Sequence, residues 1–410
     1  MNNDYHYRSN KLTHNITTPN NDINMIYGLN KTHDVTCPVV DFDFIDDFKK
    51  EYSDNGLCNG YNYIDAINEK QDRVVAFGDI HGDYNLLIRL LKLSNVVKIN
   101  DDGKLKWIGG KTYIVQVGDQ IDSCRPIGTY TCDKPVGKDG KDNGDDIKIL
   151  EVMTDLHNQA VKDGGAVISL LGNHEIMNSQ GDMNHVSYEN IRIFDNYKDP
   201  NDETKKFNNG KDARIHAFAP GNQYAKLMGC TRLPAVVIGA NIFVHAGIID
   251  SILDDIELRN LNDLEKINVK VKKWLLGKMD EKCVENIIKR SKNSMFWTRE
   301  LGHINADTPL ENPVCTKNIS QLMNLIDKDK QIQEKNKIIQ FGSIVIGHTP
   351  QSFRHNEQIN STCGGKIWRV DNGSSHAFDI FDKNDHYKEN RKAQYLEILK
   401  DNEYVVHVED

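Results

Sequence analysis

Five short apolar segments of this chain each end in a polar cluster that begins with glycine or histidine. In order, they are 73–77 with GDIHGD, 113–117 with GDQID, 166–171 with GNHE, 241–244 with HAG, and 343–346 with GHTP. Their Val, Ile and aromatic residues are typical of buried strands. Segments with apolar residues at helical spacing, such as 84–93 and 147–161, lie between them. The alternation predicts an α/β fold with largely buried sheets.

The polar clusters are candidates for a functional site, because ligands of α/β sheets bind beyond the carboxyl ends of the strands. Together they offer two Asp, one Asn and three His: Asp79, His81, Asp119, Asn173, His245 and His348. This mixture of oxygen and nitrogen donors suits Mn, Fe or Zn better than Ca or Mg. A single such cluster would more often be a turn or a satisfied polar group. Five in series favour a metal site.

The donor set is large enough for two ions. Asp79 and His81 lie two residues apart in one turn, which suits one ion. Asn173 and the two later His suit a second ion, and Asp119 is the natural bridge. Two ions about 3.5–4 Å apart can share a hydroxide and clamp an in-line displacement at phosphorus.

The order of the five motifs resembles that of the calcineurin-like metallophosphoesterase superfamily. The longer stretch GNHEIMNSQGD at 172–182 is similar to the GNHE-x-MN-x-x-GD signature of the Shewanella-like protein phosphatases, a bacterial-type branch of the phosphoprotein phosphatases. The segment APG at 219–221, upstream of FVHAG, also fits that branch. The likeness covers about 72–379. It implies a four-layer α/β sandwich of two mixed β-sheets flanked by helices.

The resemblance also implies roles for individual residues. The first metal ion would be held by Asp79, His81 and Asp119, and the second by Asp119, Asn173, His245 and His348. Mn is the first choice for the two divalent ions, with Fe or Zn as alternatives. His174 would protonate the leaving oxygen, since an imidazole titrates near neutral pH. Asp122 would accept the other ring N–H of His174 and fix its tautomer.

The arginines that would bind phosphate are harder to assign. Related phosphatases read GDxxDRG, but Ser123 stands where that arginine would be. Arg125 is a possible substitute, with a surface residue as the alternative. Arg299, in FWTRE, resembles a second phosphate-side arginine, with a salt-bridged surface residue as the alternative. Arg214 is a weaker candidate for the same role. Guanidinium groups suit this task because they bind phosphate with two parallel hydrogen bonds.

The function predicted from these residues is that of a dinuclear-metal phosphomonoesterase, acting as a protein phosphatase on phosphorylated Ser, Thr or Tyr of a phosphoprotein or phosphopeptide. The alternative is a phosphoanhydride hydrolase of the diadenosine-polyphosphate or RNA-cap type, which would use the same motifs. A metal-dead scaffold that binds phosphoproteins is less favoured, because every predicted ligand is intact. Two further residues are expected to have structural roles: Asp371 as a turn cap and His185 as an ordinary histidine.

Charge and cysteine content bear on partners and location. Lys+Arg number 51 against 60 Asp+Glu, a net charge of -9, which disfavours stable nucleic-acid binding and a polybasic membrane anchor. The longest apolar run, 235–253, contains His245 and glycines, so it is a poor membrane span. No export signal is visible, and the eight cysteines contain no CxxC. We therefore expect reduced thiols, including unpaired Cys124 and Cys132, and a cytoplasmic location.

The domain organisation predicted is a polar, partly flexible N-terminal extension over 1–70 and a catalytic domain over 71–410. Within the extension, 41–47 (DFDFIDD) is a candidate docking segment. A surface loop rich in Gly, Lys and Asp, 124–143, is inserted in the catalytic domain. Alternating apolar residues over 394–408 predict a closing hairpin.

Overall fold

The computed structural model describes residues 35–54, 56–127, 130–135, 142–328, 340–352, 358–384 and 391–410. The chain divides into Met1–Thr36 and Cys37–Asp410, and the second unit carries the fold. Of the predicted polar extension, residues 1–34 lie outside the described residues. So do residues 128–129 and 136–141 of the predicted surface loop; its remaining residues form neither helix nor strand.

The first sheet has six strands in the order β14-β13-β2-β5-β6-β7. Their bounds are β2 (Arg73–Phe77), β5 (Tyr113–Gln116), β6 (Ala166–Leu170), β7 (Arg232–Leu233), β13 (Gln394–Leu399) and β14 (Glu403–Val408). Strands β2, β5, β6 and β7 are parallel, and β13 pairs antiparallel with both β2 and β14. The hairpin predicted at the C-terminal end is thereby confirmed.

The second sheet also has six strands, in the order β1-β8-β9-β10-β12-β11. Their bounds are β1 (Ile67–Asn68), β8 (Ala235–Ile238), β9 (Asn241–Val244), β10 (Ser343–Ile346), β11 (Asn360–Thr362) and β12 (Ile367–Arg369). Strands β9, β10 and β12 are parallel, whereas β8 and β11 run antiparallel to their neighbours β9 and β12. A separate two-stranded sheet joins β3 (Val97–Ile99) to β4 (Leu105–Trp107).

Alternation along the strands explains how the two sheets pack. In β2, Val74 and Ala76 lie in an apolar cluster with Phe243 and Val345 of the second sheet. Val75 and Phe77, on the opposite face, contact the helices outside the first sheet. Successive side chains of a strand point to opposite faces, so each buried strand contributes to two apolar layers. The chain therefore contains two mixed sheets packed face to face.

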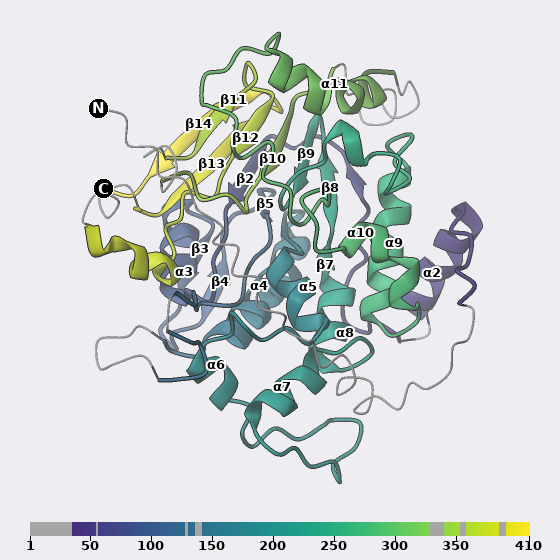
Figure 1. Cartoon of the computed structure of the whole chain (residues 1–410). Coiled ribbons are helices and arrows are strands. Elements are labelled where there is room, and N and C mark those ends of the chain that lie inside the picture. Colours follow the sequence, from purple (N-terminus) through teal and green to yellow (C-terminus); the bar gives the residue numbers. More distant parts are fainter. Residues whose placement is uncertain are drawn as a thin grey trace, which may run out of the picture. The chain divides into compact units, whose positions relative to one another are not determined.

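Helices cover the outer face of each sheet (Figure 1). The first sheet is covered by α3 (Tyr84–Leu93) and α4 (Asp146–Ala160). The second is covered mainly by α9 (Asp263–Leu275) and α11 (Pro313–Lys328). The described residues also form the α-helices α2 (Phe42–Asp54), α5 (Asn173–Ser179), α6 (Tyr188–Arg192), α7 (Gly210–Phe218), α8 (Gln223–Thr231) and α10 (Glu285–Ile288). The predicted four-layer arrangement of helices, sheet, sheet and helices is confirmed.

Residues 37–70 belong to this compact unit, whereas the sequence predicted an extension as far as residue 70. Helix α2 buries Ile45, Phe48 and Tyr52 on one stripe, and the Tyr52 hydroxyl donates to the carbonyl of Cys230 at 2.7 Å. Strand β1 pairs with β8. The abundant Asp and Lys of α2 lie on its outer side and obscure this apolar stripe in the sequence.

All eight cysteines are paired, so the expectation of reduced thiols was wrong for this structure. The disulfides are Cys37–Cys283, Cys58–Cys230, Cys124–Cys132 and Cys315–Cys363. Two of them join residues 246 and 172 positions apart, and no local spacing pattern reveals such pairs. Because disulfides persist mainly in oxidising environments, the argument from reduced thiols for a cytoplasmic location no longer holds.

The Cys58–Cys230 disulfide is expected to contribute strongly to stability, because it closes a loop of 172 residues. Replacing both cysteines by alanine should lower the free energy of unfolding by about 2–5 kcal/mol, since the unfolded chain regains the entropy of that loop. Urea denaturation followed by circular dichroism measures this loss. The matched control is the double alanine variant of Cys124–Cys132, which closes only 8 residues and should cost less. Equal losses from the two pairs would contradict the loop-length explanation.

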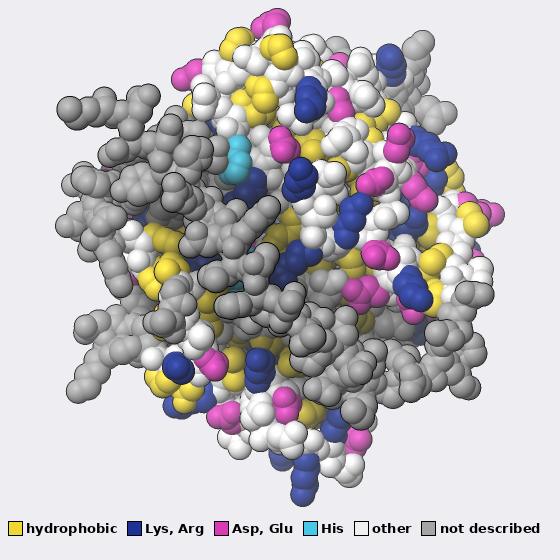
Figure 2. Space-filling model, viewed as in Figure 1, with side chains coloured by type: hydrophobic (Ala, Val, Ile, Leu, Met, Phe, Trp, Pro, Cys, Tyr) yellow, Lys and Arg dark blue, Asp and Glu magenta, His cyan; other side chains and the backbone are white. Residues whose placement is uncertain are grey.

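The described surface and helices add two observations on partners. None of the described helices combines the length and apolar character needed to span a bilayer. On the described part of the face in Figure 2, acidic and basic side chains are interspersed. The expected absence of stable nucleic-acid binding stays a prediction.

Candidate metal centre

The five motifs converge because the strands that precede them run in parallel. Strands β2, β5 and β6 are neighbours in the first sheet, and β9 and β10 are neighbours in the second. Sharp backbone turns follow these strands: His81, Asp119, Asp122 and His348 all have positive φ, between 48° and 72°. Such conformations are costly for residues other than glycine and tend to occur at functional sites.

Two glycines allow the motifs to approach one another closely. A Cβ atom on Gly172 would lie 2.2 Å from Oδ1 of Asp119, and one on Gly347 would lie 2.2 Å from Oδ1 of Asp79. Both distances are far below van der Waals contact. Glycine at these two positions is therefore needed to bring the carboxylates against the neighbouring loops.

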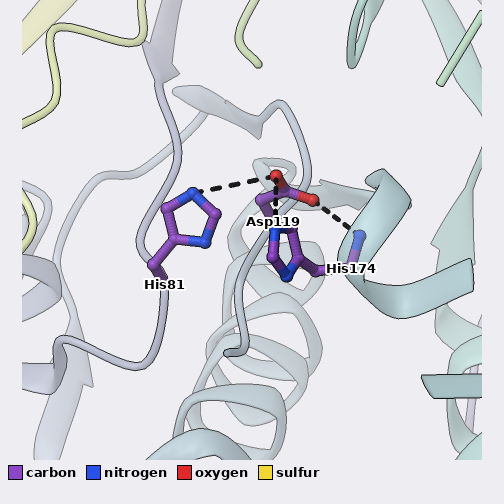
Figure 3. Close-up of side chains that lie close together, drawn as sticks. All are labelled: His81, Asp119 and His174. Atoms are coloured by element: carbon purple, nitrogen blue, oxygen red, sulfur yellow. Dashed lines mark hydrogen bonds and ion pairs between the residues drawn. The ribbon is translucent and has the colours of Figure 1, made fainter. Parts of the chain in front are cut away.

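The first group of possible ligands surrounds Asp119 (Figure 3). The side chains of His81, Asp119 and His174 place possible ligand atoms within 4.8 Å of one another, all in buried positions. Oδ2 of Asp119 lies 3.7 Å from Nε2 of His81 and 3.8 Å from Nε2 of His174. Asp79 is on the same side, with its Oδ2 3.6 Å from Nε2 of His81.

The second group shares the Asp119 carboxylate. Asp119, His245 and His348 also place possible ligand atoms within 4.8 Å of one another. Nε2 of His245 lies 3.3 Å from Oδ2 of Asp119 and 2.9 Å from Oδ1 of Asn173. All six residues predicted to hold metal ions thus lie around one carboxylate.

Backbone carbonyls fix which nitrogen His81 and His245 present. Nδ1 of His245 donates to the carbonyl of Val117 at 2.9 Å, and Nδ1 of His81 faces that of Ile121 at 3.3 Å. These contacts leave Nε2 of both rings for a ligand. Such outer hydrogen bonds are the usual way in which metal-binding histidines are oriented.

The electrostatics of the centre fit bound cations. Burial, followed by repulsion from Asp371 and Asp119, raises the pKa of Asp79 well above its usual range. Burial also raises the pKa of Asp371 to about 6 and lowers the pKa of His81 and His348 well below the usual value. His245 differs from the other two histidines: against the effect of burial, the neighbouring Asp119 raises its pKa. Burial disfavours the ionised form of Asp79 and Asp371, and divalent ions bound beside these carboxylates would stabilise that form.

The two carboxylate oxygens of Asp371 differ in their hydrogen bonds. Its Oδ1 accepts the backbone N–H of Gly373 at 2.9 Å, which matches the predicted turn cap. Its Oδ2 is buried and has no hydrogen-bond partner among the described residues. An orphaned buried oxygen beside Asp79 is the observation that best fits a metal ion, or water bound to one, in this place.

His174 and Asp122 form a close pair beside this centre. Nδ1 of His174 lies 2.8 Å from Oδ2 of Asp122, and both side chains are buried. Because a carboxylate oxygen accepts, the imidazole donates from Nδ1 and directs Nε2 toward Asp119. This is the pairing that the sequence predicted for these two residues.

Two of the three predicted arginines lie at the edge of the centre. Arg125 donates from Nη1 to the carbonyls of Asp122 and Cys124, and its guanidinium carbon lies 4.8 Å from the centroid of the Phe378 ring. Arg299 donates from Nη1 to the carbonyl of His348 at 2.7 Å. Arg125 is therefore on the Asp122 side of the centre and Arg299 on the His348 side.

Arg214 does not match its predicted role in substrate binding. Its side chain is fully buried, and its donors go to Asn178, Asn190 and Asp146 behind Asp122. A guanidinium without exposed surface has no means of gripping a substrate phosphate. The sequence shows the arginine but not the direction in which α7 points it.

Three residues near the centre were missed or undervalued in the sequence. The His185 ring lies 5.0 Å from that of His174, and burial lowers the pKa of His185 to about 4. The Phe378 ring lies 5.4 Å from that of His81. Asn178, in the GNHE-x-MN signature, donates to Asp122. Only Asn178 belonged to a recognisable motif; the other two come close through tertiary packing.

Comparison with known proteins agrees with this geometry. Residues 72–352 match the family model of the calcineurin-like phosphoesterases. The chain is 26% identical over 339 residues to Shewanella-like protein phosphatase 2 of Arabidopsis thaliana, covering 75% of this chain and 72% of that protein. It is 28% identical over 326 residues to Shewanella-like protein phosphatase 1 of Plasmodium berghei, covering 77% and 70%.

The chain is also similar to a viral protein and to a solved structure. An uncharacterized protein, R398 of Acanthamoeba polyphaga mimivirus, is 38% identical over 258 residues, covering 60% of this chain and 93% of that protein. The crystal structure of a cold-active protein-tyrosine phosphatase from a psychrophilic Shewanella species superposes with a TM-score of 0.56 and 19% identity. It covers 85% of this chain and 81% of that one, which shows a shared fold.

Proposed function

Because the chain belongs to the calcineurin-like phosphoesterase family, a family of metal-dependent phosphoester hydrolases, we propose that it is a dinuclear-metal protein phosphatase. Its substrates would be phosphorylated Ser, Thr or Tyr residues of proteins. The observation that carries the proposal is the shared position of Asp119. Its Oδ2 lies 3.7 Å from Nε2 of His81 in one donor group and 3.3 Å from Nε2 of His245 in the other.

The two donor groups divide the predicted ligands between two ions. Asp79 and His81 would hold one ion, and Asn173, His245 and His348 the other, with Asp119 shared. Mn is the first candidate, with Fe or Zn as alternatives, since the donors mix carboxylate, amide and imidazole. When bound, such ions activate water and neutralise charge on the phosphoryl group.

The residues around the metal ligands would protonate the leaving group and bind the phosphate. His174 would donate a proton from Nε2 to the departing oxygen, while Asp122 holds its Nδ1–H at 2.8 Å. Arg125 and Arg299 would bind the non-bridging phosphate oxygens from opposite sides. Both guanidinium groups already lie against residues of the centre, through Asp122 and His348 respectively.

An aromatic surface beside the centre favours phosphotyrosine among the possible substrates. Phe378 and Phe381 lie on the 3-10 helix η4 (His376–Asn384), with their ring centroids 6.2 Å apart. Phe381 is 40% exposed, whereas Phe378 is only 6% exposed and contacts the His81 ring, so the accessible part of this surface belongs to Phe381. A phenyl phosphate ester can pack its ring on such a surface, whereas a serine ester cannot.

The proposal is tested by measuring phosphate release with Mn²⁺ from a panel of phosphoserine, phosphothreonine and phosphotyrosine peptides, beside diadenosine tetraphosphate. We expect turnover of the peptides, with phosphotyrosine preferred, and loss of turnover when a chelator removes the metal. Preference for the dinucleotide would instead support a phosphoanhydride hydrolase. Peptide binding without any phosphate release would support a metal-dead scaffold.

A further inference from the structure

A fully buried polar cluster lies behind His174 and Asp122. It consists of Asp146, Asn178 and Arg214, which come from α4, α5 and α7 and have no exposed surface. Burying a guanidinium and a carboxylate is costly unless their hydrogen bonds are satisfied. The cluster joins three separate helices and contacts both the backbone and the side chain of Asp122.

Asn178 holds both oxygens of the Asp122 carboxylate. Its Nδ2 lies 3.0 Å from Oδ1 and 3.0 Å from Oδ2 of Asp122, and 3.0 Å from the carbonyl of His174. Nη2 of Arg214 also lies 3.6 Å from Oδ1 of Asp122, so both side chains help to hold the carboxylate in place. The same Oδ2 accepts the Nδ1–H of His174 at 2.8 Å, so the orientation of the carboxylate determines that of the imidazole.

Arg214 determines which way the Asn178 amide faces. Its Nε donates to Oδ1 of Asn178 at 3.0 Å. A reversed amide would set its NH₂ against the guanidinium, which has no acceptor, and its oxygen against the Asp122 carboxylate. Both contacts would be repulsive. The guanidinium therefore forces the Asn178 amide to donate toward Asp122.

Asp146 completes the arrangement. Its Oδ2 accepts from Nη2 of Arg214 at 2.8 Å, and its Oδ1 accepts the backbone N–H of Asp122 at 3.1 Å. Asp122 has a φ of 72°, a conformation that needs support from its surroundings. Asp146 thus holds the backbone of Asp122, while Asn178 holds its side chain.

We propose that Asn178, oriented by Arg214, is a positioning residue that aligns the Asp122–His174 pair for proton transfer to the leaving oxygen. The inference rests on the proposed role of His174 as the acid. Displacing a catalytic group by about 1 Å lowers the rate of reaction roughly 10²-fold.

The test compares two substrates that differ in their need for an acid. Phenyl phosphate releases a basic phenoxide and needs protonation, whereas 4-nitrophenyl phosphate releases a far weaker base. Asn178→Ala is expected to lower kcat for phenyl phosphate by about 10–100-fold and for 4-nitrophenyl phosphate much less, with KM for both unchanged. A purely structural defect would lower both kcat values alike.

Two further variants keep the test interpretable. Asn268→Ala removes another fully buried asparagine, whose amide is hydrogen-bonded to the backbone of Ala235 outside the site. This variant should leave kcat unchanged for both substrates. Asn178→Ser retains a hydroxyl donor and should recover part of the kcat lost in Asn178→Ala. If the alanine variant unfolds at a much lower temperature than the unmodified protein, the serine variant takes its place in the test.

The outcomes separate this inference from the proposed function. His174→Asn should show the same selective loss on phenyl phosphate, and a larger one. Suppose that His174→Asn shows this selective loss, but that Asn178→Ala lowers kcat equally for both substrates or for neither. The positioning role of Asn178 is then wrong, while the acid role of His174 stands. If His174→Asn shows no selectivity between the substrates, the acid role fails and the positioning role fails with it.

Discussion

Replacement of Asp119 by asparagine is expected to lower kcat for phosphate release by at least about 10³-fold, which corresponds to about 4 kcal/mol of transition-state stabilisation. Oδ2 of Asp119 lies within 3.8 Å of Nε2 in His81, His174 and His245. An amide supplies no second negative oxygen to share between two ions. We therefore also expect bound metal to fall below two ions per chain.

Turnover with Mn²⁺ and metal content by plasma emission spectrometry measure these two effects together. The matched control is Asp83→Asn, a change in the same GDIHGD motif. Asp83 caps α3 by accepting the N–H of Leu86 at 2.9 Å and also pairs with His376. That variant should keep its metal and most of its activity. Two retained ions and normal turnover in Asp119→Asn would show that this carboxylate is not the bridge.

Replacement of His174 by asparagine is expected to lower kcat by about 10²–10⁴-fold on phosphopeptides, the usual contribution of a positioned acid. The metal content should stay unchanged, because the other predicted donors remain. The ring of His174 meets Asp122 at 2.8 Å through Nδ1, and only its other nitrogen faces Asp119. The loss should therefore fall on kcat rather than on KM.

His185→Asn provides the control for this prediction. The two imidazole rings lie 5.0 Å apart, but His185 has its Nδ1 3.4 Å from the carbonyl of Cys124, on the surface-loop side. Burial lowers its pKa to about 4, so His185 is neutral near pH 7 and a poor proton donor. We expect a much smaller loss of kcat. Comparable losses in both variants, or loss of metal in His174→Asn, would contradict the assignment of His174 as the acid.

The architecture was largely predictable because its signals are local. The apolar runs at 73–77 and 166–171 and the helical pattern at 84–93 each report their own structure through periodicity. Parallel strands then bring their carboxyl ends to one edge, which explains why Asp79, Asp119 and Asn173 meet although they are far apart in the chain. The segment 37–70 was misjudged because the apolar stripe of α2 is narrow and its partner, α9, begins more than 200 residues later.

The disulfides and the buried cluster illustrate what depends on packing. Cys37 meets Cys283 across 246 positions, and nothing in the neighbourhood of either residue points to the other. The sequence shows that Arg214 is positively charged but not which group it contacts. Only the direction of α7 decides that it holds Asn178 at 3.0 Å instead of facing a substrate.

The sequence by itself determined the α/β class and which residues are candidate metal donors, from Asp79 to His348, because residue type and position after a strand are properties of short segments. The sequence also predicted Asp119 as the carboxylate shared by the two donor groups, whereas tertiary structure alone decided that Phe378 lies against His81. It also decided that three helices converge behind Asp122. The separation of these residues along the chain does not indicate how close they lie in space. Their contacts therefore depend on how the helices and sheets pack.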